Sequence, residues 1–491
     1  MSIPSRAAWL TLTVVALVAG VARAAPTDDW LTACRLDQVT LARSVPARCG
    51  RLAVPENRDD PASREIELAV ALVPSLNIDP LPDPLVLIAG GPGQSTIEFY
   101  LGYQGAFEAV RLNREILLID QRGTGASNPL VCPDVEAQFE DSSDLDVIAR
   151  AAELCIAALD GDPRYFTTSV AVRDLDAVRE ALGYESLNIY GVSYGTRVAQ
   201  HYARRFPDRL RRMILDGVAY PGLILGPAIA IDAQNALDQM FARCAADSRC
   251  SDRFPNLADD FTTLRTQLAD EPATVVLPDP RTGSQTEQLL GTAEFGAAMR
   301  LLSYSPTTVA LMPLLIDEAL HNDNLQPLAA QFAMIERQLV STLNIGMHYA
   351  VVCSEDAPFY GEVGDIVQTL SETYLGQQSY DAMAAVCTAW PAGPIDADFR
   401  EPLAVDTPTL LLSGENDPVT PPIYAEKATE GLSQHQHVVG PAYGHGLAPH
   451  GCVPRLMARF LEAEEPLPVD AACVDDLAVM PFFVDFSGPA E

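Results

Sequence analysis

The stretch Leu187 to Phe206, LNIYGVSYGTRVAQHYARRF, decides the fold of this 491-residue chain. In it a short apolar run is followed by Gly191-Val192-Ser193-Tyr194-Gly195 and then by apolar residues at helical spacing. A G-x-S-x-G turn between a strand and a helix is typical of a nucleophile elbow, in which small residues allow a strained turn to expose the serine. The pattern therefore predicts a strand over 187–190, a helix over 196–206 and a nucleophilic Ser193. The alternative is an ordinary glycine-rich turn without chemistry.

Short apolar runs of the same kind occur on both sides of this stretch. They are Leu85 to Ile88, Ile116 to Ile119 and Met213 to Leu215, and each ends in a turn that contains glycine. Runs that are apolar on both faces are typical of buried parallel strands. The segment 175–182 between them has apolar residues at helical spacing. This alternation predicts an α/β fold with a mostly parallel sheet and flanking helices.

A serine becomes a nucleophile when a base removes its proton and a carboxylate orients that base. In chains with a nucleophile elbow the acid and then the histidine follow the serine, each just after a strand. Asp417 follows a strand-like run over 409–412, and His445 follows another that ends at Gly440. We therefore predict Asp417 as the acid and His445 as the base.

Two neighbours compete for these roles. Glu415 lies in the same turn as Asp417, which then has the alternative role of capping the turn before Pro418. His450 follows close behind His445, but only His445 has a glycine on each side, which permits a tight approach. The sequence favours Asp417 and His445.

An oxyanion hole requires two N–H donors near the serine. One is expected from Tyr194, directly after the nucleophile, and the other from the loop after an early strand. The loop Gly90-Gly91-Pro92-Gly93 is in that position, and Pro92 has no N–H, so Gly91 is the candidate. The alternative for this loop is a tight turn without a catalytic role.

The alternation of strands and helices stops near Pro221 and returns near Pro402. Between these points the pattern is mostly helical. We therefore expect one core built from residues 25–220 and 403–491, with residues 221–402 inserted as a helical cap.

Residues 1–24 have the features of an export signal. Arg6 precedes the apolar run Ala7 to Gly20, and Ala22-Arg23-Ala24 provides a cleavage pattern. No later apolar run approaches the ~18 residues that a membrane-spanning helix needs. We expect a secreted or periplasmic protein that has no contact with the membrane after cleavage.

The ten cysteines all follow the predicted cleavage site and form local couples. The couples are Cys34/Cys49, Cys132/Cys155, Cys244/Cys250, Cys353/Cys387 and Cys452/Cys473. An even number in an exported protein favours disulfides, and pairing of neighbours is the simplest choice among the possible connectivities. Metal binding is the weaker alternative, because the chain contains no C-x-x-C pair.

The chain carries 66 acidic and 32 basic residues, which gives a formal charge of −34. Such a surface repels phosphate backbones, so nucleic acid is not expected as a partner. The simplest interpretation of the acidity is solubility; the alternative is an electrostatic field that attracts cationic substrates such as protonated peptides, which requires a site that binds them.

With these motifs identified, the chain resembles the proline iminopeptidase and tripeptidyl aminopeptidase branch of the α/β hydrolases. The motifs that carry the resemblance are Gly90-Gly91-Pro92-Gly93, Asp120-Gln121-Arg122-Gly123-Thr124-Gly125-Ala126-Ser127, Gly191-Val192-Ser193-Tyr194-Gly195-Thr196, Asp417-Pro418-Val419-Thr420-Pro421 and Gly444-His445-Gly446. The resemblance implies the α/β-hydrolase fold with a helical cap, and acyl-enzyme chemistry that needs no cofactor and no metal. The chain departs from many relatives at Ala89, where they have histidine.

The resemblance also implies cleavage next to the free N-terminus of a peptide, whose ammonium group is held by acidic cap residues. Glu355 is the candidate, with Asp356 as reserve; the alternative is that Ser354 caps a helix with Glu355 in its first turn. Within the D-Q-R-G-T-G motif we expect Asp120 and Arg122 to form an ion pair rather than act in catalysis.

Two other functions are compatible with the same motifs. An esterase or lipase has the same triad but is indifferent to a free amine. A non-catalytic binding protein of this fold usually lacks one triad member, whereas all three candidates are present here.

The export signal and the cysteine couples generate one prediction. Protein isolated from its native host should have an intact mass that lacks residues 1–24 and should contain no alkylatable thiol under denaturing conditions. Several reactive thiols in the denatured protein would show that the disulfide prediction is wrong.

Overall fold

The computed structural model describes residues 30–38, 43–132, 144–279, 282–364 and 366–489. The predicted export signal, residues 1–24, lies outside these ranges. No helix in the described ranges has the length and apolar character needed to cross a bilayer.

A nine-stranded sheet forms the centre of the molecule, in the order β1-β2-β3-β5-β4-β6-β7-β10-β11. The strands are β1 (Thr32–Gln38), β2 (Arg43–Pro55), β3 (Glu65–Val73), β4 (Leu85–Ile88), β5 (Ile116–Ile119), β6 (Leu187–Val192), β7 (Leu210–Asp216), β10 (Thr409–Gly414) and β11 (His435–Gly440). From β5 to β11 all neighbours are parallel, whereas β1, β2 and β3 are joined antiparallel at the other edge. The prediction of a mostly parallel α/β sheet is confirmed.

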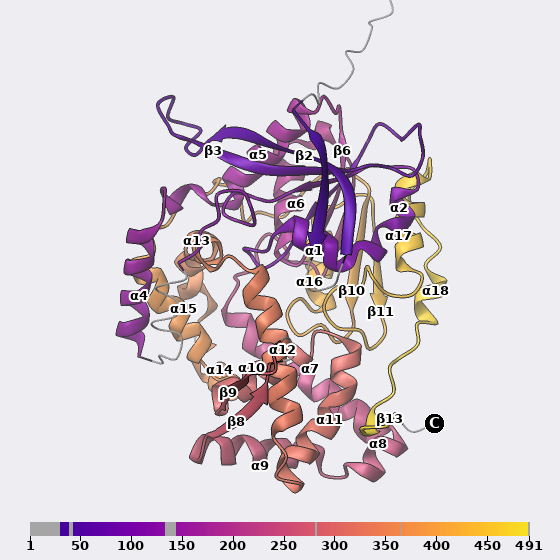
Figure 1. Ribbon diagram of the computed structural model, residues 1–491. Coiled ribbons are helices and arrows are strands. Elements are labelled where there is room, and N and C mark those ends of the chain that lie inside the picture. Colours follow the sequence, from indigo (N-terminus) through magenta and orange to yellow (C-terminus); the bar gives the residue numbers. More distant parts are fainter. Residues whose placement is uncertain (1–29, 39–42, 133–143, 280–281, 365, 490–491) are drawn as a thin grey trace, which may run out of the picture.

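Helices cover both faces of the sheet (Figure 1). On one face the apolar sides of α5 (Thr168–Ala181) and α6 (Tyr194–Arg205) pack in one core cluster. On the other face α1 (Thr96–Tyr103), α2 (Glu108–Arg111) and α17 (Val453–Glu462) contribute to a second cluster. Because the central strands are apolar on both sides, they bury side chains in both clusters.

Between β7 and β10 the chain leaves the sheet, and α7 to α12 gather below it in Figure 1. The elements of this region are α7 (Pro227–Ala246), α8 (Ser248–Arg253), α9 (Leu257–Asp270), β8 (Ala273–Pro278), β9 (Gln285–Leu290), α10 (Thr292–Leu302), α11 (Pro306–His321), α12 (Gln326–Thr342), α13 (Ile345–Glu355), α14 (Ile366–Ser371) and α15 (Gln378–Ala389). The hairpin β8–β9 was not predicted, because β9 exposes most of its residues and lacks a clear apolar alternation.

The inserted region packs in two ways. Helices α7 to α12 build an apolar cluster of their own, whereas Met347 and Val351 on α13 and Trp390 after α15 belong to the core cluster beside α5 and α6. The later helices of the insertion are therefore fixed to the same layer that carries the G-x-S-x-G turn.

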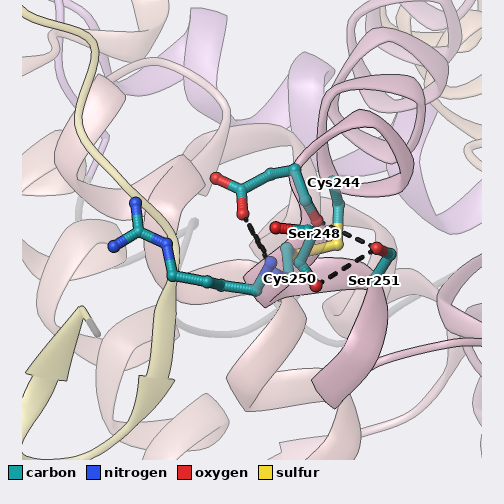
Figure 2. The surroundings of a disulfide bond; sticks show 6 residues. Cys244, Ser248, Cys250 and Ser251 are labelled. Carbon is teal, nitrogen blue, oxygen red and sulfur yellow. Dashed lines mark hydrogen bonds between the residues drawn. A yellow bond between two sulfur atoms is a disulfide. The ribbon is translucent and has the colours of Figure 1, made fainter. Parts of the chain in front are cut away.

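All five disulfides join the cysteine couples that the sequence predicted. Figure 2 shows Cys244–Cys250, which ties the last turn of α7 to α8. The Asp247 carboxylate accepts hydrogen bonds from the backbone N–H groups of Arg249 and Cys250 and so caps α8. A disulfide that closes a short loop limits the freedom of the unfolded chain.

The C-terminal segment returns to the inserted region. After α17 and α18 (Ala472–Asp475), Phe482 is buried in the apolar cluster of α7 to α12. The Arg243 guanidinium on α7 lies 4.2 Å from the centre of the Phe482 ring. The short strands β12 (Phe483–Asp485) and β13 (Gly488–Pro489) follow. Helix α18 contacts β11 of the central sheet, whereas β12 contacts α8 and α11 of the inserted region.

Candidate active site

The G-x-S-x-G sequence forms a sharp turn between β6 and α6. Ser193 has φ 56° and ψ −126°, which is uncommon for a residue other than glycine. A side chain at Gly195 would collide with the carbonyl oxygen of Ile88 on β4, and one at Gly191 would collide with Gly195. The glycines are therefore required because the turn passes directly against the neighbouring strand. The geometry is that of a nucleophile elbow.

The structure brings the Asp417 and His445 side chains together. Asp417 Oδ2 lies 2.8 Å from His445 Nδ1, and both side chains are almost fully enclosed. A carboxylate only accepts hydrogen bonds, so Nδ1 carries the proton and Nε2 is left as an acceptor. No hydrogen bond joins Ser193 Oγ to His445 in the described ranges. Such bonds are often long before substrate binds.

Asp417 is fixed by the turn that follows β10. Its Oδ1 accepts the N–H groups of Val419 and Thr420, each at 2.8 Å, and its Oδ2 accepts the Thr420 hydroxyl at 2.9 Å. These hydrogen bonds stabilise the ionised carboxylate in the orientation that contacts His445.

The two residues that compete for the roles of acid and base, Glu415 and His450, make other contacts. Glu415 accepts the backbone N–H of Ala442 at 2.8 Å, and His450 packs against Tyr443 with ring centres 4.6 Å apart. Neither has the carboxylate–imidazole contact that Asp417 and His445 share.

Asp216, at the end of β7, ties the site together and was not singled out from the sequence. Its carboxylate accepts the N–H groups of Leu447 and Ala448, just after His445, and the Tyr190 hydroxyl of β6. Its backbone carbonyl accepts the N–H of Ser193 at 2.9 Å. One buried residue therefore contacts both the serine turn and the histidine loop. The only signal in the sequence was its place before glycine at a strand end.

The loop Gly90 to Gly93 lies against the serine. A Cβ atom at Gly90 would be 2.9 Å from Ser193 Cβ and 3.4 Å from its Oγ, so Gly91 follows the point of closest approach. Neither the Gly91 N–H nor the Tyr194 N–H donates to another group within the described ranges. Both candidate oxyanion donors thus have no acceptor among the described residues.

Burial by itself would lower the pKa of His445, but the carboxylates of Asp417 and Asp216 outweigh it and raise the pKa above its ordinary value. For Asp417, burial would raise the pKa, yet His445 and the N–H groups of Thr420 and Val419 hold it below its ordinary value. The pair is therefore suited to an ionised carboxylate next to an imidazole that gains a proton during the reaction.

Glu355 and Asp356 lie at the C-terminal end of α13, fully buried under α6, so Ser354 does not cap the start of a helix. Asp356 binds the Arg197 guanidinium through both oxygens at 3.1 Å, and Glu355 lies 3.6 Å from the same group. Glu355 also accepts the N–H of Thr168 at 2.6 Å. We call Arg197, Glu355, Asp356 and Thr168 the buried ion cluster. Both carboxylates already have partners in it.

The expected ion pair between Asp120 and Arg122 is wrong. Asp120 accepts the Ser95 hydroxyl and the N–H groups of Ile97 and Ala126, and so closes the loop after β5. Arg122 instead pairs with Asp174 on α5, at 2.6 and 2.8 Å. Both residues follow the end of β5, where the chain leaves the strand and turns, and their side chains reach different elements: Asp120 contacts the first turn of α1, and Arg122 contacts α5.

A cavity of about 370 Å³ borders Asp417 between α7 and the start of α16 (Pro422–Ala428). Acidic and amide side chains line it, including Asp232, Asp238 and Glu415. Burial raises the pKa of Asp232 to about 7, although the Tyr424 hydroxyl donates to it. In the described ranges no group of His, Cys, Asp and Glu side chains is arranged to hold a metal ion.

The buried ion cluster generates a prediction about pH. Burial raises the pKa of Glu355 to about 7 from an ordinary 4.5, so between these values the folded protein binds more protons than the unfolded chain. The free energy of unfolding should therefore fall as pH rises through this window. Glu355→Gln cannot titrate at this position, so its stability should not include this pH-dependent decrease. The Tm of the variant minus the Tm of the wild type should therefore increase from pH 5 to 8. Exposed Glu372→Gln is the matched control; parallel Tm curves for wild type and Glu355→Gln would contradict the prediction.

Comparison with known proteins agrees with this geometry. Residues 83–252 match the family described as alpha/beta hydrolase fold, and residues 372–473 match the family described as TAP-like protein. Serine protease Hip1 of Mycobacterium tuberculosis is 28% identical over 468 residues, which cover 84% of this chain and 86% of the relative.

Two further relatives match part of the chain. Tripeptidyl aminopeptidase of Streptomyces lividans is 34% identical over 194 residues, 36% of each chain. Carboxylesterase B of Mycobacterium tuberculosis is 30% identical over 247 residues, 46% of this chain and 47% of the relative. The fold, the serine turn and these similarities agree: the chain is a serine hydrolase of the α/β-hydrolase fold and belongs to its TAP-like branch.

Proposed function

We propose that the protein is a secreted serine exopeptidase that cleaves peptides near their free N-terminus through an acyl-enzyme. The observation that carries the proposal is the 2.8 Å contact of Asp417 with His445 beside the strained Ser193 turn. The relatives named serine protease and tripeptidyl aminopeptidase support a peptide as substrate. The five disulfides support export, and the leader over 1–24 would direct it.

In the proposed reaction Ser193 Oγ attacks the scissile carbonyl carbon while its proton passes to His445 Nε2. The N–H groups of Tyr194 and Gly91 stabilise the oxyanion, and Asp417 stabilises the imidazolium. His445 then gives the proton to the leaving amine as the C–N bond breaks. Water attacks the acyl carbon and loses a proton to His445; His445 then gives this proton to Ser193 Oγ as the bond from the acyl carbon to Oγ breaks, which releases the acid and regenerates the hydroxyl.

We propose that residues 25–220 and 403–491 form the catalytic core and residues 221–402 the cap. The contacts of Tyr304 with His445 and of Asn344 with Gly93 support a cap that encloses the site. Tyr304 accepts the backbone N–H of His445 through its carbonyl, and Asn344 donates from its backbone N–H to the Gly93 carbonyl, each at 2.9 Å. A cap that closes over the serine restricts access to short or extended chains.

Recognition of the substrate ammonium requires a carboxylate near the serine, and two positions offer one. Glu355 and Asp356 remain the candidates from family resemblance, but their engagement with Arg197 weighs against a direct contact in this conformation. Asp232 lines the cavity beside Asp417 and offers a carboxylate with one oxygen engaged by Tyr424. The two positions are separable by mutation.

An esterase is the second candidate, because the match to carboxylesterase B covers nearly half of each chain. The same triad hydrolyses esters and amides, so the distinction depends on whether the substrate amine is recognised.

The proposed nucleophile generates one prediction. A fluorophosphonate should label Ser193 with one equivalent per chain, and Ser193→Ala should abolish both labelling and turnover. Because members of a triad act as a unit, the double variant Ser193→Ala/His445→Ala should be hardly slower than either single variant. Near-native turnover by Ser193→Ala would contradict the mechanism; exposed Ser371→Ala is the control.

Recognition of the amine generates another prediction. Acetylating the N-terminus of a good peptide substrate should lower kcat/KM by at least ~10²-fold, because it leaves a desolvated carboxylate unpaired. If Glu355 is the ligand, Glu355→Gln should reduce cleavage of the free-amine peptide and leave the acetylated one unchanged. Asp232→Asn should do so instead if the cavity beside Asp417 receives the ammonium. Equal rates on free and acetylated peptides would favour the esterase.

A further inference from the structure

Arg300 on α10 contacts Tyr304, which in turn contacts the proposed catalytic base, His445. Its Nη2 donates to the Tyr304 hydroxyl at 2.9 Å, and its guanidinium carbon lies 5.6 Å from the centre of the Tyr304 ring. Tyr304 in turn packs edge-on against His445 with ring centres 5.2 Å apart. The close approach of the Tyr304 carbonyl to Gly444 leaves no space for a side chain there. Tyr304 therefore contacts both the His445 ring and the Arg300 guanidinium.

Arg300 has no acidic partner among the residues that the structure describes. Among the described residues no Asp or Glu oxygen forms an ion pair with it, and its buried Nε has no hydrogen-bond partner. In a chain with 66 acidic and 32 basic residues, a half-buried arginine without a carboxylate is unexpected. Arginines that are partly buried normally pair with an anion.

The charge of Arg300 lowers the pKa of two histidines near the site, His445 and His348. It opposes the rise in the pKa of His445, and it contributes, after burial, to the low pKa of His348, which is about 4. His348 on α13 lies beside Pro92, in the loop that holds the proposed oxyanion donor Gly91. The guanidinium thus lies close enough to act on both the histidine loop and the oxyanion loop.

An unpaired cation at this place opposes catalysis. When His445 accepts the serine proton it becomes an imidazolium, and a nearby like charge raises the energy of that state. A substrate carboxylate bound to Arg300 would neutralise the guanidinium and remove the repulsion. Arginine is also well suited to this partner, since its planar fork donates two parallel hydrogen bonds to a carboxylate.

We propose that Arg300, together with the Tyr304 hydroxyl, forms a subsite for a carboxylate on the leaving-group side of the scissile bond. That side is indicated because His445, which Tyr304 contacts, delivers its proton to the leaving amine. The substrate class is then peptides whose leaving part is anionic, either through a C-terminal carboxylate close to the cleaved bond or through an acidic side chain. This inference rests on the proposed function for its peptide substrate.

The test uses peptide pairs that differ in one carboxylate. Tetra-alanine with a free C-terminus is compared with its C-terminal amide, and tri-alanyl-glutamate amide with tri-alanyl-glutamine amide. In the wild type the carboxylate should increase kcat/KM by at least ~10-fold, as expected for one charge-assisted contact. A gain confined to the first pair identifies the C-terminal carboxylate as the ligand, and a gain confined to the second identifies an acidic side chain.

In Arg300→Gln the gain should fall to within about twofold of unity, whereas Arg300→Lys should keep part of it. Arg455→Gln, which removes the same charge from the exposed face of α17, should retain the full gain. Thermal unfolding of each variant shows whether the fold is intact. A wild type that shows no gain, or a gain that survives in Arg300→Gln, would overturn the subsite.

Ester substrates separate this inference from the exopeptidase proposal. Hydrolysis of 4-carboxyphenyl acetate is compared with that of 4-carbamoylphenyl acetate, so the carboxylate is again on the leaving group. If peptides are not cleaved but the carboxyl ester is preferred in an Arg300-dependent way, the exopeptidase proposal fails and the subsite stands. On the neutral ester, Arg300→Gln should move the lower limb of the kcat/KM pH profile to higher pH, because the pKa of His445 rises when the opposing charge of Arg300 is removed. A purely structural role for Arg300 would leave that limb in place.

Discussion

The structure depends on the buried carboxylate of Asp216 at the end of β7. It holds two N–H groups of the loop that carries His445 and the Tyr190 hydroxyl of the strand that leads to Ser193, while its carbonyl holds the Ser193 N–H. A carboxylate with no exposure is costly to bury unless its oxygens accept hydrogen bonds, and here those bonds come from both the histidine loop and the strand before the serine. Because a shift of either loop would break hydrogen bonds of this buried residue, Asp216 restrains the relative positions of Ser193 and His445.

The buried ion cluster stabilises the strained serine turn through its contacts with α6. Arg197 lies one turn into α6, and its guanidinium is held by Asp356 and the Leu223 carbonyl. Thr168 connects the cluster to the Tyr194 hydroxyl at 2.6 Å, directly after the nucleophile. Such a network fixes the helix that follows the turn, and a strained φ persists only where its surroundings determine it.

Features set by neighbours in the sequence could be predicted, and features set by distant contacts could not. The apolar runs predicted the central strands, and the G-x-S-x-G pattern predicted the turn. The position after a strand predicted Asp417 and His445, and the structure brings their side chains together. The partner of Arg122 could not be found in this way, because Asp174 belongs to a different element that only the folded topology places beside it. Asp216, Arg300 and the contact of Glu355 with Arg197 were missed for the same reason: each depends on which elements the folded topology brings together.

The order of the strands has a consequence for synthesis and secretion. The serine turn follows β6, but β10 and β11, whose ends hold Asp417 and His445, come after the whole insertion in the chain. On the proposed assignment, every N-terminal fragment that stops before β11 has a nucleophile without its base and a sheet without its final parallel edge. The nascent chain is then inert until almost all of it has emerged, so topology delays activity as an inhibitory propeptide would.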